Sequence, residues 1–336
     1  IRMDTEEKLV FGFDRLLIAT GVKPRTPDIP GTAFQNVFTV ISLQDALHLQ
    51  AALAPASHVA IIGAGYTGLE FAENLHALGK TVSIFEREPH VMSSLDADMA
   101  QIVEFELRRF GVQVFTSARV LALVGQNGRV SGVKSATGLG IAPADVVLLD
   151  VGVQPNVDLI QDTGIQIGTT GGIAVDAHME TNIPGVFAAG NCAETLCAIR
   201  QKPVSSAIGT VAAKQGRIAG ENLAGGRSRF LGAIGTTVLK VFELGVARTG
   251  LTSQEALAER MPIVFSRIEA QDRASYYPGT RKVWIKLIVD RETRRLIGAQ
   301  AAGYGDVSKR IDVAATAISN GMRIDDVAQL DLAYSP

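Results

Sequence analysis

A glycine-rich turn inside the chain constrains the fold more than any other feature of the sequence. The apolar run His58–Ile62 leads into the turn Gly63-Ala64-Gly65-Tyr66-Thr67-Gly68, and apolar residues with helical spacing follow it. A second apolar run, Thr81–Phe85, ends at the acidic residue Glu86. The order of strand, Gly-x-Gly-x-x-Gly turn, helix, strand and acidic residue is typical of a fold that binds a dinucleotide.

Each glycine of such a turn has a physical role. We expect Gly63 to allow the tight turn, Gly65 to let the backbone approach a pyrophosphate, and Gly68 to bring the helix close to the strand. The N-terminus of the helix would face the phosphate charge. Glu86 stands 23 residues after Gly63, where a carboxylate would accept from a ribose 2′-hydroxyl and repel a 2′-phosphate. The pattern predicts NADH as the ligand, while Arg87 beside Glu86 leaves NADPH possible.

The position of the turn predicts a domain inserted into another domain, because the turn does not stand at the beginning of the chain. Buried runs that end in Thr20-Gly21 before the turn and in Gly190-Asn191 after it predict two strands with small residues at their ends. Backbone could approach a ligand at both places, although a tight turn alone also explains them. The segment 23–31 carries three prolines and predicts an extended linker.

The last third of the chain predicts a separate α+β domain. Strands are expected at 237–242, 263–268, 283–289 and 296–301, and helices at 253–260, 307–319 and 324–330. A hairpin is also expected earlier, where Val120–Val124 and Arg129–Lys134 flank Gln126-Asn127-Gly128. The predicted segments are 1–40, 41–150, 151–226 and 227–336.

Composition excludes several classes of function. A chain of 336 residues fits two or three domains, and its net charge of −2 gives no electrostatic reason to expect nucleic acid or a membrane as partner. No apolar run reaches the ~18 residues that span a bilayer. Only Cys192 and Cys197 are present, which argues against a disulfide scaffold and indicates a reducing cytoplasm. Cys192 is expected to be a small core residue, and the five histidines lack metal-ligand spacing.

Together these features resemble the pyridine nucleotide-disulfide oxidoreductases, a family of flavoproteins. The matching segments are 16–21, 63–70, 152–156 and 181–191. The resemblance implies an α/β fold with two Rossmann-like domains, in which an FAD domain is split by an inserted NAD(P)H domain. A C-terminal α+β domain would then form a homodimer.

The resemblance also implies which residues bind the cofactors FAD and NADH. Those expected near the flavin are Thr20, Gly21, Gly152, Gly190 and Asn191. Tyr66 lies within the dinucleotide turn, and Glu70 matches a family glutamate near the nicotinamide, although Glu70 also fits a helix surface. Most members carry aspartate at the position of Asn191, whose amide keeps a hydrogen-bonding group but lacks the charge.

Two further segments resemble the branch that contains coenzyme A-disulfide reductases and NADH oxidases. They are Tyr276-Tyr277-Pro278-Gly279 and the terminal Leu330–Pro336. The branch implies that Tyr277 and Tyr334 are catalytic and reach the active site of the partner subunit. Packing against neighbouring residues is the alternative explanation for both tyrosines.

The expected activity is transfer of electrons from NADH through FAD to a small-molecule disulfide, such as coenzyme A disulfide or polysulfide. An NADH oxidase that reduces oxygen is the alternative enzyme. A nucleotide-binding, dimerising fragment without turnover is the alternative of another class, because the family's FAD fingerprint and redox cysteine would both precede residue 1.

Overall fold

The computed structural model describes residues 9–138 and 140–333, which form two compact units. One unit consists of Ile1–Lys23 with Gln154–Ala233, and the other of Pro24–Val153 with Ile234–Pro336. The four predicted segments stay a proposal for how these units subdivide. None of the helices in the described ranges has both the length and the apolar character needed to cross a membrane.

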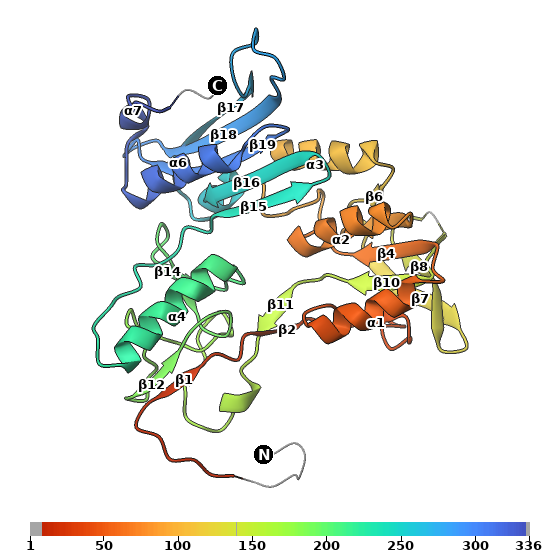
Figure 1. The fold of residues 1–336 in the computed structure, drawn as a ribbon, viewed down its shortest axis with the longest axis horizontal. Coiled ribbons are helices and arrows are strands. Elements are labelled where there is room, and N and C mark those ends of the chain that lie inside the picture. The colour runs from red at the N-terminus through yellow and green to blue at the C-terminus, as the bar shows by residue number, and fades with distance from the viewer. Residues whose placement is uncertain (1–8, 139, 334–336) are drawn as a thin grey trace. The chain divides into compact units, whose positions relative to one another are not determined.

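The first unit is a small α/β body. Strands β1 (Leu16–Ile18) and β12 (Val186–Ala188) pair in parallel, and helix α4 (Gly209–Leu223) packs against both (Figure 1). Ile18, Ala188 and Ala219 belong to its core. The predicted strands at both places are therefore confirmed. Strand β12 is buried throughout, as predicted, but in β1 only Ile18 is buried and Leu17 is exposed. Its other elements are β13 (Thr195–Cys197), β14 (Lys202–Val204) and the 3-10 turn Asp158–Ile160, while β2 (Val22–Pro24) and β11 (Val153–Pro155) form a separate pair.

The second unit contains a parallel sheet in the order β3-β10-β4-β5-β6. The strands are β3 (Val37–Phe38), β4 (His58–Ile62), β5 (Thr81–Phe85), β6 (Gln113–Phe115) and β10 (Val146–Leu149). The helices are α1 (Leu43–Leu53), α2 (Tyr66–Ala77) and α3 (Ala97–Arg109). Val59–Ile62 are buried because β4 is central and covered on both faces, as parallel strands require. The predicted strand–turn–helix–strand unit is thus confirmed.

A three-stranded antiparallel sheet is attached to this fold. It consists of β7 (Val120–Gln126), β8 (Arg129–Ser135) and β9 (Ile141–Pro143). Asn127 and Gly128 both have positive φ, 52° and 74°, the backbone that a two-residue hairpin turn favours. The predicted hairpin is confirmed.

The C-terminal residues of the same unit form a five-stranded antiparallel sheet in the order β15-β16-β19-β18-β17. Its elements are β15 (Thr237–Val241), β16 (Leu244–Gly250), α5 (Ser253–Ala258), β17 (Ile263–Gln271), β18 (Lys282–Asp290), β19 (Leu296–Gly303), α6 (Ser308–Ser319) and α7 (Ile324–Val327). Strand β16 was not expected from the sequence. This strand has glycines at 245 and 250 and little alternation, so its pairing with β15 and β19 decides its structure.

One continuous core joins the nucleotide fold to the C-terminal sheet. Leu69 and Leu107 from the nucleotide fold share a buried cluster with Val241 and Leu244 from the sheet. The rings of Phe110 and Phe242 stack with their centroids 4.3 Å apart, while α2 and α3 pack against β15. The parallel sheet and the antiparallel sheet therefore fold as parts of one compact body.

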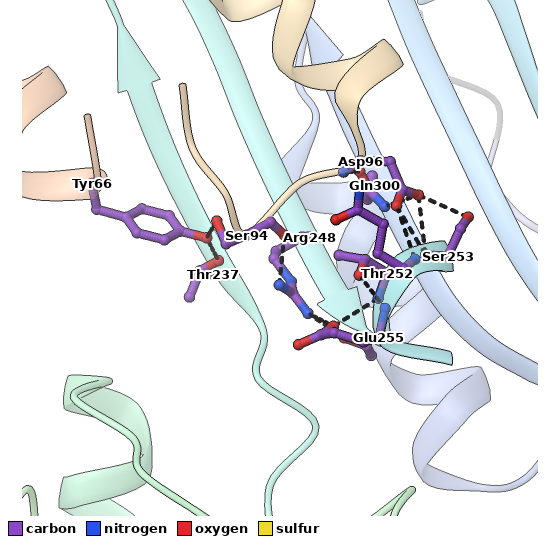
Figure 2. A network of polar contacts seen from close by, with 11 residues as sticks. Tyr66, Ser94, Asp96, Thr237, Arg248, Thr252, Ser253, Glu255 and Gln300 are labelled. Carbon is purple, nitrogen blue, oxygen red and sulfur yellow. Dashed lines mark hydrogen bonds and ion pairs between the residues drawn. The ribbon is translucent and has the colours of Figure 1, made fainter. Parts of the chain in front are cut away.

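A buried polar network crosses the same junction (Figure 2). Asp96, at the N-cap of α3, donates its backbone N–H to Gln300 Oε1 at 2.8 Å. Its carboxylate accepts from Gln300 Nε2 at 2.8 Å and from Ser253 Oγ at 2.9 Å. The Lys286 ammonium lies 3.0 Å from Asp96 and 2.8 Å from Asp98, and its side chain is only 4% exposed. Every charge at the centre of this junction is therefore paired.

The network controls the charge of Asp96. Burial alone would raise the pKa of this carboxyl, but hydrogen bonds from Lys286 and Ser253 outweigh burial and hold the pKa below its usual value of 3.8. The stabilisation from this carboxylate is present above pH 3.8 and is lost as the pH falls through the lower pKa of the folded state.

We expect Asp96→Ala to lower the free energy of unfolding by about 3 kcal/mol, because it leaves the buried Lys286 ammonium with one partner fewer. Urea unfolding at neutral pH measures the change. Asp98→Ala is the matched control and should cost clearly less, since the Asp98 side chain is 37% exposed and Asp96 still pairs with Lys286. Equal losses in the two variants would contradict the central role of Asp96.

Candidate functional site

The turn between β4 and α2 has no room for side chains at two of its glycines. Gly63 has a φ of +106°, and a Cβ there would lie 2.1 Å from the carbonyl oxygen of Asp150. A Cβ at Gly68 would lie 2.8 Å from the carbonyl oxygen of Gly63. Both glycines are therefore required by close packing of the turn, the helix and the end of β10.

Gly65 differs from these two, because the chain itself does not exclude a side chain there. Its φ is −80°, and an added Cβ would meet only the Asp150 carboxylate, at 3.5 Å. Gly65 is also the N-cap of α2 and provides no side-chain cap, so the first amides of the helix lack an intrahelical acceptor. Open space beside the amides at a helix N-terminus is what a pyrophosphate needs, although the Gly68 amide already donates to the Asp150 carboxylate.

Glu86 is fixed at the end of β5, next to this turn. Its Oε2 accepts from the Ala64 amide at 2.8 Å, and its Oε1 accepts from the Glu88 amide at 2.9 Å. A carboxylate offers about four acceptor positions, so Glu86 retains capacity for ribose hydroxyls. The Arg87 side chain is 79% exposed and pairs with Glu88 at 3.0 Å, which directs its charge toward Glu88.

Tyr66 is held by the C-terminal sheet, as Figure 2 shows. Its hydroxyl lies 2.6 Å from Thr237 Oγ1 and accepts from Ser94 Oγ at 3.3 Å. The sequence placed Tyr66 in the turn but did not indicate these partners. Glu70 is exposed on α2, one turn beyond Tyr66.

Asp150 is a site residue that the sequence analysis missed. It directly follows β10, and its Oδ2 accepts from the Gly68 amide at 2.7 Å. Burial raises the pKa of this carboxyl, the charges of Glu86 and Glu70 add to the rise, and the Gly68 hydrogen bond opposes it. An acidic residue directly after a fully buried parallel strand was the signal that could have identified it.

Gly152 lies two residues beyond Asp150, with a φ of +91° and open space around its Cβ position. Its carbonyl oxygen accepts from the Arg25 amide at 3.0 Å. Gly152 belongs to the same compact unit as the dinucleotide turn.

In the first unit, the two predicted strand ends have different surroundings. Thr20 Oγ1 donates to the carbonyl oxygen of Asn156 at 2.5 Å, and the Asn156 amide donates to Gly21 at 2.9 Å. The Gly190 amide donates to Gln215 Oε1 at 2.9 Å. These bonds fix the backbone just after the carboxyl ends of both parallel strands, β1 and β12.

Polar atoms without partners are present in this unit. Asn191 Oδ1 and Ser206 Oγ are buried and have no hydrogen-bond partner within the described part of the chain. A buried acceptor left unpaired is costly, so such atoms fit a site that is completed by a polar ligand. Helix α4 begins after Ile208, which cannot cap it through its side chain. These features fit the hydroxyls and phosphates of FAD.

The cysteines do not form a redox pair. Cys192 is 0% exposed, and its Sγ donates to the carbonyl oxygen of Ala189 at 3.3 Å. Cys192 and Cys197 are both free and buried. Cys192 is a core residue, as expected. Within residues 9–138 and 140–333, no three His, Cys, Asp or Glu side chains are arranged to hold a metal ion.

The two catalytic candidates lie in the C-terminal part of the chain. Tyr277 is 39% exposed in the loop between β17 and β18, where the Arg273 guanidinium lies 5.7 Å from its ring centroid. Its amide donates to the carbonyl oxygen of Ala274 at 2.9 Å. Tyr334 lies outside the described residues.

Comparison with known families gives two matches. Residues 2–216 match the sequence model described as pyridine nucleotide-disulphide oxidoreductase. Residues 236–336 match the dimerisation domain of the same family. The predicted fold class, with a C-terminal dimerisation domain, is confirmed.

Individual relatives cover nearly the whole chain. An NAD(P)H sulfur oxidoreductase (CoA-dependent) from Pyrococcus furiosus is 37% identical over 339 residues, which cover 100% of this chain and 75% of that protein. An NADH oxidase from Methanocaldococcus jannaschii is 35% identical, over 96% of this chain and 72% of that protein.

Solved structures of related proteins also match nearly the whole chain. An NAD-dependent persulfide reductase from A. fulgidus matches with a TM-score of 0.94 and 41% identity, over 97% of this chain and 61% of that one. The chain therefore spans about three fifths of that reductase. A water-forming NADH oxidase from Lactobacillus brevis bound to NADH matches with a TM-score of 0.93 and 26% identity, over 99% of this chain and 73% of that one.

We expect Gly65→Ala to lower dinucleotide affinity at least tenfold while changing the free energy of unfolding by less than about 1 kcal/mol. The reason is that its added methyl group meets open space in the chain and occupies the approach to the helix amides. Calorimetric titration with NADH and urea unfolding measure the two effects. Gly216→Ala, a change within α4 that also meets open space, is the control for loss of a glycine. Unchanged affinity in Gly65→Ala would contradict the assignment of the turn.

Proposed function

Because the chain belongs to the pyridine nucleotide-disulphide oxidoreductase family, we propose that it is a flavin-dependent enzyme that takes reducing equivalents from NADH. We assign a small-molecule disulfide or polysulfide, such as coenzyme A disulfide, as the acceptor. The observation that carries the proposal is the open approach at Gly65 beside the anchored carboxylate of Glu86. Relatives named as sulfur and persulfide reductases support the choice of acceptor.

Different residues of the chain bind the dinucleotide and the flavin. The first amides of α2 bind the pyrophosphate, and Glu86 accepts from the adenosine ribose. Asn191 offers its unpaired Oδ1 to a flavin hydroxyl, and its neutral amide adds no negative charge beside the flavin phosphates. When bound, FAD supplies the two-electron chemistry between dinucleotide and acceptor.

The two subunits of the proposed enzyme associate through the C-terminal domain. Its match to the family's dimerisation domain supports a homodimer with two-fold symmetry, in which each subunit offers the same surface. Two free, buried cysteines are consistent with a cytoplasmic location. In this arrangement Tyr277, exposed on its loop, is proposed to reach the partner's active site.

An NADH oxidase is the second candidate, because relatives with that name match the chain as fully as the reductases do. The two functions differ in what Tyr277 does. A phenol can stabilise a leaving thiolate and donate a proton to it, which accelerates disulfide reduction but not transfer to oxygen.

The full-length protein, expressed from its gene, allows a direct test of the electron acceptor. NADH should bleach its bound flavin under anaerobic conditions, and coenzyme A disulfide should restore the colour without oxygen. Tyr277→Phe should slow the second step about tenfold to a hundredfold and leave the first unchanged, since only the second needs the proton. Tyr276→Phe, which changes the 84% exposed neighbour, is the control.

Two results would contradict the proposal. If oxygen alone restored the colour and disulfide did not, the protein would be an oxidase. A colourless protein that forms dimers and binds NADH would support a nucleotide-binding fragment without turnover.

We expect Glu86→Ala to reduce the preference for NADH over NADPH about tenfold, the scale of a hydrogen bond to a charged group of about 1–2 kcal/mol. Dissociation constants for both dinucleotides measure the change. Glu86→Gln removes the charge that repels a 2′-phosphate and keeps one acceptor oxygen, but its NH2 group also loses one of the two bonds from the Ala64 and Glu88 amides, so urea unfolding must accompany this variant. Equal affinities for NADH and NADPH in the unaltered protein would rule out the role of Glu86.

A further inference from the structure

The carboxylate of Asp150 lies where a dinucleotide pyrophosphate would approach the turn. Its Oδ2 accepts from the Gly68 amide at 2.7 Å, in the first turn of α2. The same oxygen would lie 3.5 Å from a Cβ placed on Gly65. Gly65 is the position at which the backbone is open to a ligand, so Asp150 borders that opening from the side of β10.

The charges around Asp150 are negative. Glu86 faces it from the end of β5 and Glu70 from α2, and both carboxylates disfavour its ionised form. Among the described residues, no Lys or Arg side chain forms an ion pair with Asp150. Arg25, on the segment bonded to Gly152, donates its Nε to the carbonyl oxygen of Val153 at 3.0 Å. Within residues 9–138 and 140–333, the Gly68 amide is thus the one polar partner of Asp150 that favours the ionised form.

Arrival of a pyrophosphate would change this balance. A pyrophosphate diester brings two further negative charges to the N-terminus of α2, beside a carboxylate that is already partly buried among like charges. The positive end of the α2 dipole cannot neutralise both groups fully, because it is equivalent to about half an elementary charge. Binding is therefore most favourable when one of the negative charges is removed.

We propose that Asp150 takes up one proton from solvent when the dinucleotide binds. This role rests on the proposed function. It makes Asp150 a residue that positions the dinucleotide. The protonated carboxyl keeps one oxygen as acceptor for the Gly68 amide and gains an O–H donor for the ligand. Glu86 differs from Asp150 in that both of its oxygens already accept from backbone amides, those of Ala64 and Glu88.

The proposal predicts how affinity depends on pH. Binding that takes up a proton weakens as the pH rises, by up to about tenfold per pH unit between the pKa of Asp150 in the free protein and in the complex. Below this range Asp150 is already protonated, and affinity levels off.

Calorimetric titration with NAD⁺ tests the proposal, because NAD⁺ cannot reduce the flavin and its binding heat contains no electron transfer. Titrations at one pH in two buffers of different ionisation enthalpy give the number of protons taken up. We expect net proton uptake by the unaltered protein at a pH between the pKa of Asp150 in the free protein and its pKa in the complex. Asp150→Asn has the same shape, still accepts from Gly68 and cannot take up the proton, so its uptake should fall toward zero and its affinity should no longer change with pH.

Asp28→Asn is the matched control, because Asp28 is exposed and its change removes the same charge. It should keep the proton uptake and the pH dependence of the unaltered protein. If Asp150→Asn fails to fold, an absence of proton uptake by the unaltered protein still overturns the proposal.

The two proposals fail in different ways. No binding of NAD⁺ at any pH would contradict the dinucleotide site itself. Binding without proton uptake, or with uptake that persists in Asp150→Asn, would overturn the role of Asp150 and leave the dinucleotide site intact.

Discussion

The close approach of the β4–α2 turn to the end of β10 is the constraint on which the rest of this structure depends. Gly63 lies so near the Asp150 carbonyl that no side chain fits, and Gly68 is held against both. This contact aims the N-terminus of α2 at the opening beside Gly65 and brings Glu86 within hydrogen-bond distance of Ala64. Two neighbouring strands and one helix are thereby fixed to a single point at the carboxyl edge of the sheet, where ligands of such folds bind.

The same helix connects the site to the C-terminal sheet. One face of α2 packs on the parallel sheet, while the Tyr66 hydroxyl bonds to Thr237 at the start of β15. Asp96 ties α3 to Ser253 and Gln300 in a similar way. The dinucleotide turn is thus supported on two sides, and its geometry does not depend on loop residues alone.

Much of this arrangement was predictable, because local chemistry determines it. The glycines of the turn, the strand that precedes them and Glu86 follow from backbone sterics and strand length. Strand β16 was missed because its glycines and small residues show no alternation, and its neighbours in the sheet determine its conformation. Asp150 was missed for a related reason. Its importance arises from residues 63–68, which are distant in sequence and adjacent only in the folded sheet.

The buried Lys286 has a consequence for exchanging parts between related proteins. Its ammonium belongs to the C-terminal sheet, yet both of its carboxylate partners belong to the segment that begins α3. A chimera that takes the antiparallel sheet from one relative and the nucleotide fold from another would separate this cation from its anions unless both parents carry the same trio. The unit of exchange is therefore the pair of sheets together, even though the chain between them passes through a different compact unit.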